Sequence, residues 1–214
     1  MLCRSVLCAL ALAVFASANG TVNNFIDNVL YDMSLQVPRN GLDPLRVVPF
    51  QVKVKGNGIT NRDFKANFTQ GSIFGLSGVT RQGDCTYGTF QGLMKMGCYV
   101  TFRFVKIIMN ADVKGDQISG TKHAISTSTA VMPNTLALVE IQGHRGGPAG
   151  LANIIVNAIT MNTTVVQGKL DLKSSRYQEF IKQTHTQLSN QLHGIVHGTY
   201  AAALRTVLSR RFMP

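Results

Sequence analysis

The sequence contains no tryptophan, and only 14% of its 214 residues are charged. Acidic residues are especially scarce, with 10 Asp and Glu against 21 Lys and Arg. Carboxylates this few and this dispersed offer no pair for general acid–base catalysis. Phosphate loops and nucleophile elbows are also missing, because "GHRGGPAG" (143–150) lacks a Gly-Lys-Ser/Thr ending and "GLSGV" (75–79) is not Gly-x-Ser-x-Gly. The sequence therefore predicts a protein that is not an enzyme and needs no cofactor.

Long apolar runs are missing beyond the N-terminus, where residues 1–18 resemble a secretory signal peptide. Arg4 supplies the positive start, Val6–Ala16 the apolar centre and Ala16–Ala18 the small-residue cleavage site. A membrane anchor is the alternative, but the run is too short to span about 30 Å of hydrocarbon. We therefore expect a secreted, extracellular protein whose residues 19–214 form a single domain.

Cysteine is rare, and two of the four cysteines lie inside the predicted signal peptide. The two that remain, Cys85 and Cys98, are expected to form a disulfide in an oxidising compartment. If the two cysteines face each other across a pair of antiparallel strands, the midpoint of the segment between them falls on Gln91–Gly92. These residues would form a two-residue turn that contains glycine. The spacing predicts a β-hairpin closed by this disulfide.

The net charge is +11, and removal of Arg4 leaves 20 basic against 10 acidic residues, or +10. A basic surface attracts anions such as phospholipid headgroups, although it can also serve solubility alone. The basic residues are scattered, and phenylalanines such as Phe50 suit a core better than a base-stacking platform. No nucleic-acid partner is expected.

Two helical segments enclose a series of strands. Apolar residues of 21–36 recur at helical spacing, and a proline-free helical pattern extends from Ser174 to Arg211, with Gly194 and Gly198 able to bend it. Between them, segments such as 50–56 alternate apolar and polar residues, as half-buried strands do. Alternation of strands and helices is missing, which excludes most parallel-sheet enzymes. We predict an α+β fold with an antiparallel sheet, a short N-terminal helix and one long C-terminal helix.

Two short motifs and the order of elements carry a resemblance to a known family. "LDPLRV" (42–47) follows the N-terminal helix, "GLSGV" lies on an early strand, and the long helix ends the chain. This arrangement resembles the arthropod family of the group-seven mite allergens and, more distantly, the insect takeout and juvenile-hormone-binding carriers. Those insect carriers have a disulfide near the N-terminus, whereas Cys85 and Cys98 lie in mid-chain.

The resemblance implies a super-roll, in which a long curved antiparallel sheet wraps around the C-terminal helix, as in the half-module of the bactericidal/permeability-increasing proteins. It also implies a secreted, non-enzymatic carrier or scavenger of a lipid-like molecule held between sheet and helix. The alternative is a basic innate-defence protein that recognises anionic bacterial lipid or membranes, and a third hypothesis is a secreted partner of another protein. The side chains expected to line the ligand site come from both elements: Val52, Val54, Phe74, Val100, Phe102, Phe104, Ile181, Leu188, Leu192 and Ile195.

Three smaller motifs have competing interpretations. Asn67 and Asn162 begin N-glycosylation sequons, which can also remain unused. His193 and His197 share one helix face, which suits either zinc or packing, but no acidic residue lies near them and we predict no metal site. The loop 143–150 can form an anion nest beside Arg145 or be an ordinary loop.

Overall fold

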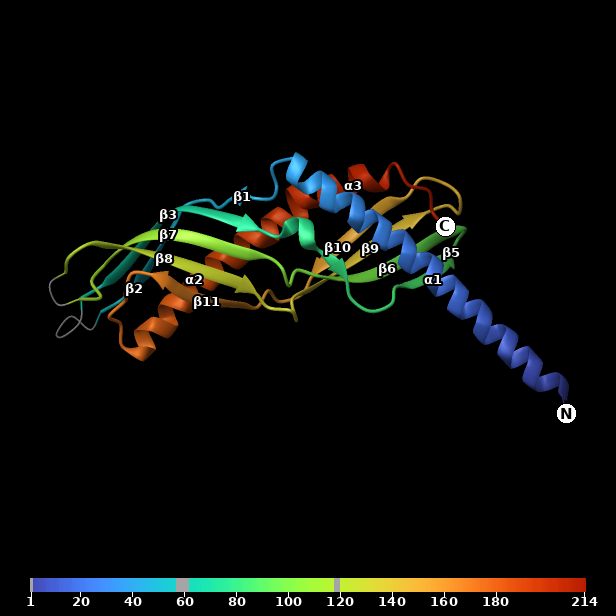
Figure 1. The fold of residues 1–214 in the computed structure, drawn as a ribbon, viewed down its shortest axis with the longest axis horizontal. Helices are drawn as coiled ribbons and strands as arrows, with labels where there is room; N and C mark the ends of the chain where they lie inside the picture. Colours follow the sequence, from blue (N-terminus) through green and yellow to red (C-terminus); the bar gives the residue numbers. More distant parts are fainter. Residues whose placement is uncertain (1, 57–61, 118–119) are drawn as a thin grey trace.

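The computed structural model describes residues 2–56, 62–117 and 120–214, with side chains from residue 20 onward, so the side chains of the predicted signal peptide lie outside the description. Figure 1 shows an elongated molecule with strands along its length and helices against them. In the described ranges, no helix is long and apolar enough to cross a membrane. The elements in chain order are α1 (Leu2–Arg39), β1 (Leu45–Arg46), β2 (Phe50–Val54), β3 (Phe64–Phe74), η1 (Leu76–Gly78), β4 (Thr80–Arg81), β5 (Thr86–Phe90), β6 (Leu93–Thr101), β7 (Lys106–Lys114), β8 (His123–Val131), β9 (Leu136–Gly143), β10 (Gly150–Val156), β11 (Met161–Gln167), α2 (Ser174–Ile195), η2 (Val196–Tyr200) and α3 (Ala201–Leu208).

In the described ranges, all strand pairs are antiparallel, and they form two sheets. Sheet A has the order β1-β3-β7-β8-β11, with β2 also paired to β3. Sheet B has the order β10-β9-β6-β4, with β5 also paired to β6. The predicted α+β fold with an antiparallel sheet and a long C-terminal helix is confirmed, although backbone pairing divides the predicted single sheet in two.

In the described part of the chain, four crossing segments pass between the sheets: residues 75–79, 102–105, 132–135 and 157–160. Neighbouring crossing segments stay hydrogen-bonded: Val131 N donates to Val105 O and Met132 N to Thr160 O, both at 2.9 Å. The two sheets are thus joined along a hydrogen-bonded seam.

α1 is much longer than the helix predicted over 21–36, because it continues through the preceding residues to Leu2. The predicted apolar face is nevertheless correct. Val22, Ile26 and Val29 are buried, and so are three further residues at helical spacing. The helix ends at Arg39, and Gly41 follows with φ +68°, a conformation that glycine adopts without strain.

The C-terminal helical region is continuous from Ser174 to Leu208 but contains one π-helical turn, η2. The turn lies beside Gly194 and includes Gly198, where the sequence predicts a bend. An inserted π-turn shifts the buried face by one position. Tyr200 is buried and Thr199 is exposed.

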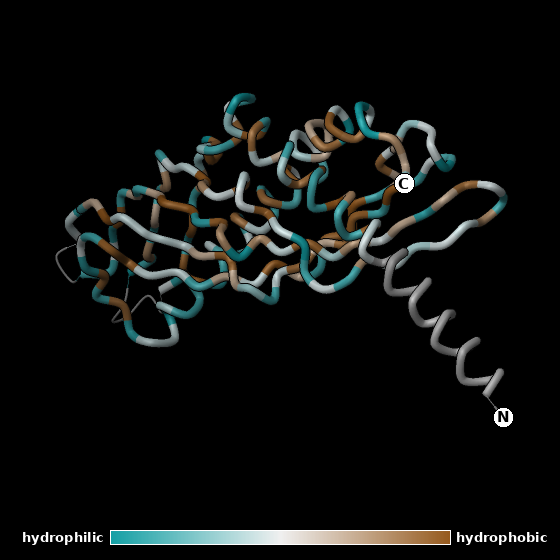
Figure 2. Tube along the Cα trace, turned by 45° about the vertical axis from the view of Figure 1, so that its right-hand side comes forward, coloured by the Kyte–Doolittle hydropathy of each residue, from teal (hydrophilic) through white to brown (hydrophobic). Residues whose placement is uncertain are grey.

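Buried and less buried side chains alternate along strands such as β2 and β7. Figure 2 shows apolar and polar residues interspersed along the chain. Val52, Val54 and Val100 are buried as predicted, but two phenylalanines are not. A β-bulge between Phe68 and Gln70 changes the phase of β3, so Phe74 lies on the outer face and is 39% exposed. β6 ends at Thr101 rather than continuing, and Phe104 lies in a turn and is 54% exposed.

The predicted hairpin and disulfide are present. β5 pairs with β6 from Thr86↔Gly97 to Phe90↔Leu93, and the turn residues Gln91 and Gly92 both have positive φ. Cys85 and Cys98 are bonded, with their Cα atoms 4.4 Å apart.

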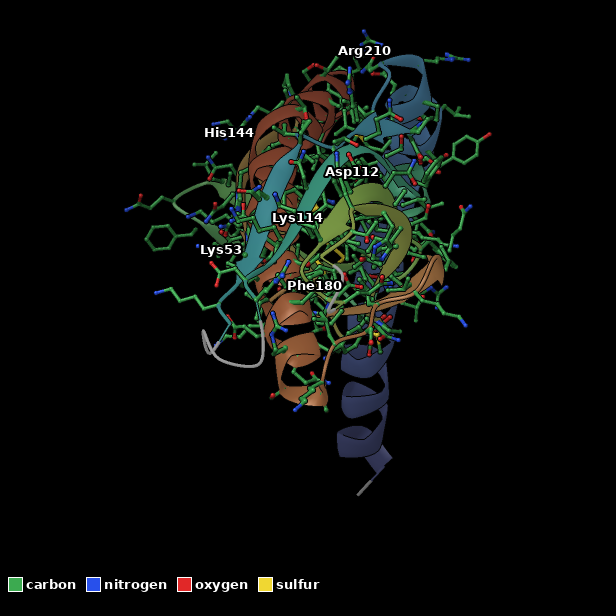
Figure 3. All side chains as sticks on the ribbon, turned by 90° about the vertical axis from the view of Figure 1, so that its left-hand side faces the viewer. Lys53, Asp112, Lys114, His144, Phe180 and Arg210 are labelled. Carbon is green, nitrogen blue, oxygen red and sulfur yellow. A yellow bond between two sulfur atoms is a disulfide. The ribbon has the colours of Figure 1, made fainter. Side chains whose placement is uncertain are left out.

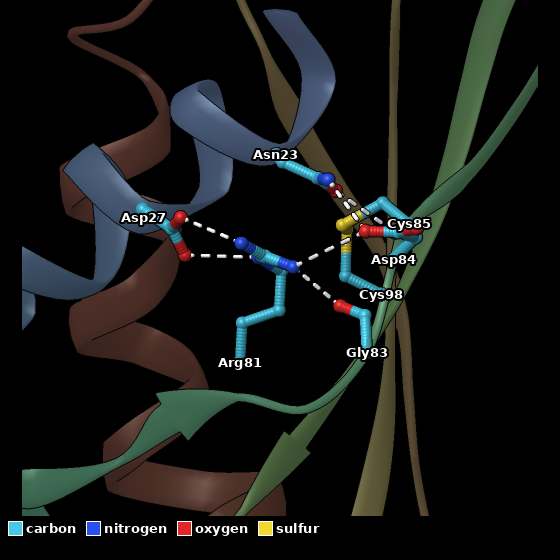
Figure 4. Close-up of polar contacts among 7 residues, drawn as sticks. All are labelled: Asn23, Asp27, Arg81, Gly83, Asp84, Cys85 and Cys98. Carbon is cyan, nitrogen blue, oxygen red and sulfur yellow. Dashed lines mark hydrogen bonds and ion pairs between the residues drawn. A yellow bond between two sulfur atoms is a disulfide. The ribbon is translucent and has the colours of Figure 1, made fainter. Parts of the chain in front are cut away.

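A polar cluster holds α1 against this hairpin (Figure 4). The Arg81 guanidinium donates to both carboxylate oxygens of Asp27, at 2.9 and 2.8 Å, and also to the Gly83 carbonyl. The bond to Asp27 raises the pKa of Arg81. Asn23 accepts from Cys85 N at 3.0 Å and donates to Asp84 at 2.9 Å. These contacts tie the helix to the backbone beside the disulfide.

The two motifs behind the family resemblance touch each other. Asp43 Oδ1 accepts from Gly75 N at 2.9 Å, and Asp43 Oδ2 accepts from Ser77 N at 2.9 Å and from Ser77 Oγ at 2.5 Å. The Asp43–Pro44 peptide bond is cis. "LDPLRV" is thus a structural corner that is fixed to "GLSGV".

Candidate functional site

Glutamines hold α2 close to one edge of sheet A. Gln191 accepts from Val48 N at 2.9 Å and donates to Val48 O at 3.0 Å, while Gln183 accepts from Lys53 N at 3.3 Å. β2 is an edge strand, and these side chains satisfy backbone groups that would otherwise lack a partner.

An aromatic cluster strengthens the same attachment. The Phe180 ring of α2 lies 5.5 Å from that of Phe64 and 6.2 Å from that of Phe68, and Phe50 stacks on Phe68 at 4.6 Å. All these partners belong to β2 and β3. The helix is therefore held at the β2 side of sheet A, and β11 forms the opposite edge.

Beside α2 lies a groove of about 540 Å³, which we call the helix groove. Its volume falls within the range of about 300–1,000 Å³ that is typical of small-molecule sites. It runs along α2 and reaches the crossing segment between β10 and β11. The lining residues are Ile159, Gln178, Ile181, Lys182, His185, Thr186, Ser189 and Asn190.

The helix groove combines an apolar part with a positive charge. Ile159 and Ile181 are half-buried and pack against the core. Lys182 contributes a cation, and the described lining contains no carboxylate. The groove can thus bury an apolar chain and attract an anionic group at the same time.

His185 connects the groove to the interior of the protein. Its Nε2 lies 2.9 Å from Thr163 Oγ1 of β11, and Thr163 Oγ1 lies 2.7 Å from Thr129 Oγ1 of β8. Both threonines are buried. Burial lowers the pKa of His185, because the protein surroundings disfavour the charged imidazolium.

Of the residues predicted to line a ligand site, only Ile181 borders the helix groove. Leu188 and Leu192 are buried in the core, as are the predicted lining residues Val52, Val54, Val100 and Phe102, whereas Ile195 is half-buried. Phe102 packs against Tyr200, with ring centroids 6.3 Å apart. Phe74 and Phe104 point outward, so those two assignments are wrong. The helix groove thus lies beside α2, whereas most of the residues predicted to line a ligand site fill the interior.

A second cavity of about 370 Å³, the hairpin pocket, lies at the far end of sheet B. Arg145, Tyr87 and Met94 line it, together with Thr21, Val22, Thr89, Gly92 and Pro214. The anion nest considered beside Arg145 is not formed by the loop amides. Gly146 N donates to Met213 O at 3.0 Å and Ala149 N to Arg211 O at 2.9 Å, so these donors are already used.

Basic residues align at the opposite end of the molecule. Lys53, Lys65 and Lys114 are directly opposite one another on three neighbouring strands. Lys53 and Lys114 are labelled in Figure 3, which views this end. Asp63 pairs with Lys53 at 2.8 Å, and this hydrogen bond lowers the pKa of Asp63. Like charges directly opposite one another destabilise a sheet, and Asp63 offsets part of this repulsion.

The remaining predicted sites have simple positions. The side chains of Asn67 and Asn162 are exposed on sheet A, where glycosylation stays a prediction. The rings of His193 and His197 stack with centroids 6.1 Å apart. Among the described residues, no three His, Cys, Asp or Glu side chains form a group that could hold a metal ion.

Comparison with known proteins gives similarities to solved structures but none to sequences. No protein-family model matches the chain, and no curated protein sequence matches it. The fold is similar to a lipopolysaccharide binding protein, with a TM-score of 0.45 and 12% identity over 90% of this chain and 40% of that one. It is also similar to Takeout 1 of Epiphyas postvittana, with a TM-score of 0.28 and 10% identity over 84% of this chain and 87% of that one. The chain thus spans about two fifths of the first protein, and membership of the mite allergen family stays a prediction.

Proposed function

We propose that this protein is a secreted, non-enzymatic carrier of a lipid-like ligand that binds in the helix groove, between α2 and the crossing segment that joins β10 to β11. The observation that carries the proposal is the groove itself, in which Ile159 and Ile181 lie beside Lys182 and His185. A ligand with an apolar chain and a polar head matches both parts of this lining.

The proposed affinity comes mainly from apolar burial. Each Å² of apolar surface removed from water contributes about 25 cal/mol. A long acyl chain therefore provides useful affinity even if only part of it is covered. The few polar groups of the groove orient the head rather than carry out chemistry.

Displacement of a fluorescent fatty acid tests the proposal. The variant Ile181→Glu places a charge among the apolar lining and is expected to weaken binding at least tenfold. Val166→Glu is the matched control, because Val166 is 60% exposed on β11 and does not line the groove. Equal binding by both variants would place the ligand elsewhere, and no binding by the unmodified protein would refute a carrier.

A second candidate function, innate defence through recognition of anionic bacterial membranes, is favoured by the charge at the far end of sheet B. We define the hairpin end as residues 87–95, 143–148 and 210–214, which include Lys95, Arg145 and Arg210 but no Asp or Glu. His144 Nδ1 donates to Gly92 O at 3.2 Å and joins two of these segments.

Exposed aromatic rings accompany this charge. Phe90 is 61% exposed and Phe212 is 68% exposed. Lys95 Nζ lies 5.6 Å from the centre of the Phe90 ring. A surface with cations and exposed rings suits the boundary between anionic headgroups and acyl chains.

Co-sedimentation with vesicles separates the two functions. Defence predicts binding to vesicles that contain anionic lipid, no binding to neutral vesicles, and weakening by salt. Phe90→Ser with Phe212→Ser should reduce this binding but leave fatty acid binding unchanged. Salt-insensitive fatty acid binding without vesicle binding would leave only the carrier.

A further inference from the structure

A buried chain of hydroxyl groups lies behind the helix groove and leads to His185. Thr129 is fully buried, and the only hydrogen-bond partner of its hydroxyl among the described residues is Thr163 Oγ1, at 2.7 Å. Thr163 is also buried and contacts His185 Nε2 at 2.9 Å. Three polar groups are thus connected by two hydrogen bonds.

The number of hydroxyl hydrogens determines the direction of these two hydrogen bonds. Each hydroxyl carries one hydrogen, and a buried hydrogen without an acceptor is costly. If His185 Nε2 donated to Thr163, only one hydrogen would remain between the two threonines to be accepted: either Thr163 would donate to Thr129 and the Thr129 hydrogen would lack an acceptor, or Thr129 would donate to Thr163 and the Thr163 hydrogen would lack one. In the opposite direction every hydrogen has an acceptor, since Thr129 donates to Thr163 and Thr163 donates to His185 Nε2.

This direction determines which nitrogen of His185 carries the proton. Because Nε2 accepts a hydrogen bond, the neutral imidazole carries its hydrogen on Nδ1. Nδ1 has no hydrogen-bond partner among the described residues. The buried polar atoms that lack a partner in this part of the chain do not include it, so Nδ1 is accessible. The ring lines the helix groove, and the groove therefore gains a fixed N–H donor.

We propose that His185 is a specificity-determining residue, whose Nδ1–H donates to the head of a carboxylate-bearing amphiphile in the helix groove. The inference rests on the proposed carrier function and adds the chemical class of the ligand. Lys182 lies one helical turn away on the same lining and attracts the same anionic head. The absence of a carboxylate from the described lining leaves no competing acceptor for either donor.

Competition between two ligands tests this assignment in the full-length protein. In the assay, hexadecanoic acid or its methyl ester competes with a bound fluorescent fatty acid, both in the unmodified protein and in the Thr163→Val variant. We expect the acid to bind at least tenfold more tightly than the ester in the unmodified protein, because a bond to a charged acceptor is much stronger. Thr163→Val should reduce this ratio at least threefold, since the imidazole is no longer held in one tautomer.

Thr129→Val is the matched control, because it makes the same isosteric change one step deeper. Thr163 can still donate to His185 in this variant, so the preference for the acid should remain. Equal binding of acid and ester would overturn the inference and leave the carrier function standing. Failure of both ligands to displace the probe would refute the inference and the carrier function together.

Nitrogen chemical shifts of the imidazole ring give an independent readout. In the unmodified protein at neutral pH, Nδ1 of His185 should be protonated and Nε2 unprotonated. In Thr163→Val the two tautomers should interconvert, with intermediate shifts. Protonation at Nε2 in the unmodified protein would overturn the proposed donor even if fatty acids bind.

Discussion

The Asp43 carboxylate accepts hydrogen bonds from three donors, the backbone amides of Gly75 and Ser77 and the Ser77 hydroxyl. Asp43→Ala leaves two partly buried amides unpaired and should cost about 2–3 kcal/mol of unfolding free energy. Ser77→Ala keeps both amide bonds and should cost about 1 kcal/mol or less. Urea unfolding of the two variants measures the difference. Equal losses would show that the amide bonds contribute little.

The Tyr200 hydroxyl is buried and has no hydrogen-bond partner in the described part of the chain. Burial raises the pKa of this phenol and keeps it neutral. Tyr200→Phe removes an unsatisfied polar atom and keeps the ring against Phe102, so it should raise the unfolding free energy by about 1 kcal/mol. Chemical denaturation checks this. A loss of stability would reveal a partner for the hydroxyl.

The pH dependence of stability reports on His185. Burial lowers its pKa below the ordinary value of 6.5, so near that pH the unfolded chain binds more protons than the folded protein. The contribution of neutral His185 is therefore complete above pH 6.5 and declines as the pH falls below it. His185→Gln should show a shallower loss of Tm between about pH 7 and pH 5. The other four histidines are common to both proteins, so parallel curves would contradict the assignment.

Among the elements, the β5–β6 hairpin is fixed by its disulfide. The loop between Cys85 and Cys98 is short and local, and its closure should contribute about 3 kcal/mol. Reduction should lower stability by up to this amount but leave α2 helical, since α2 packs mainly on β2. Denaturation with and without reductant, followed by circular dichroism, measures both effects. Two free thiols in the untreated protein would contradict the disulfide.

Elements with local signals could be predicted from the sequence. The hairpin follows from the cysteine spacing and the Gln91–Gly92 turn, and the buried face of α1 follows from its helical period. The outward position of Phe74 could not be predicted. The bulge in β3 inserts one residue and reverses which side chains of that strand are buried. The π-turn after α2 shifts the buried face of the helix. A regular apolar period in the sequence carries no sign of either insertion.

At the scale of the whole molecule, the helix groove depends on where α2 lies across sheet A. That position is determined by contacts such as Gln191 with Val48, which are 143 residues apart in sequence. Of the residues expected to line a ligand site, Ile181 is the one that borders the helix groove. His185 and its threonines have no sequence signal, because their roles arise only when α2, β8 and β11 come together.

The central claim is that a lipid-like ligand occupies the helix groove, and photo-cross-linking locates such a ligand most directly. A fatty acid with a photoactivatable group near the end of its chain is bound to the full-length protein, irradiated, and mapped by mass spectrometry. The account predicts saturable labelling at Ile159 and along residues 178–190 of α2, prevented by excess unlabelled fatty acid. Labelling confined to the hairpin pocket, or labelling that excess fatty acid does not prevent, would contradict it.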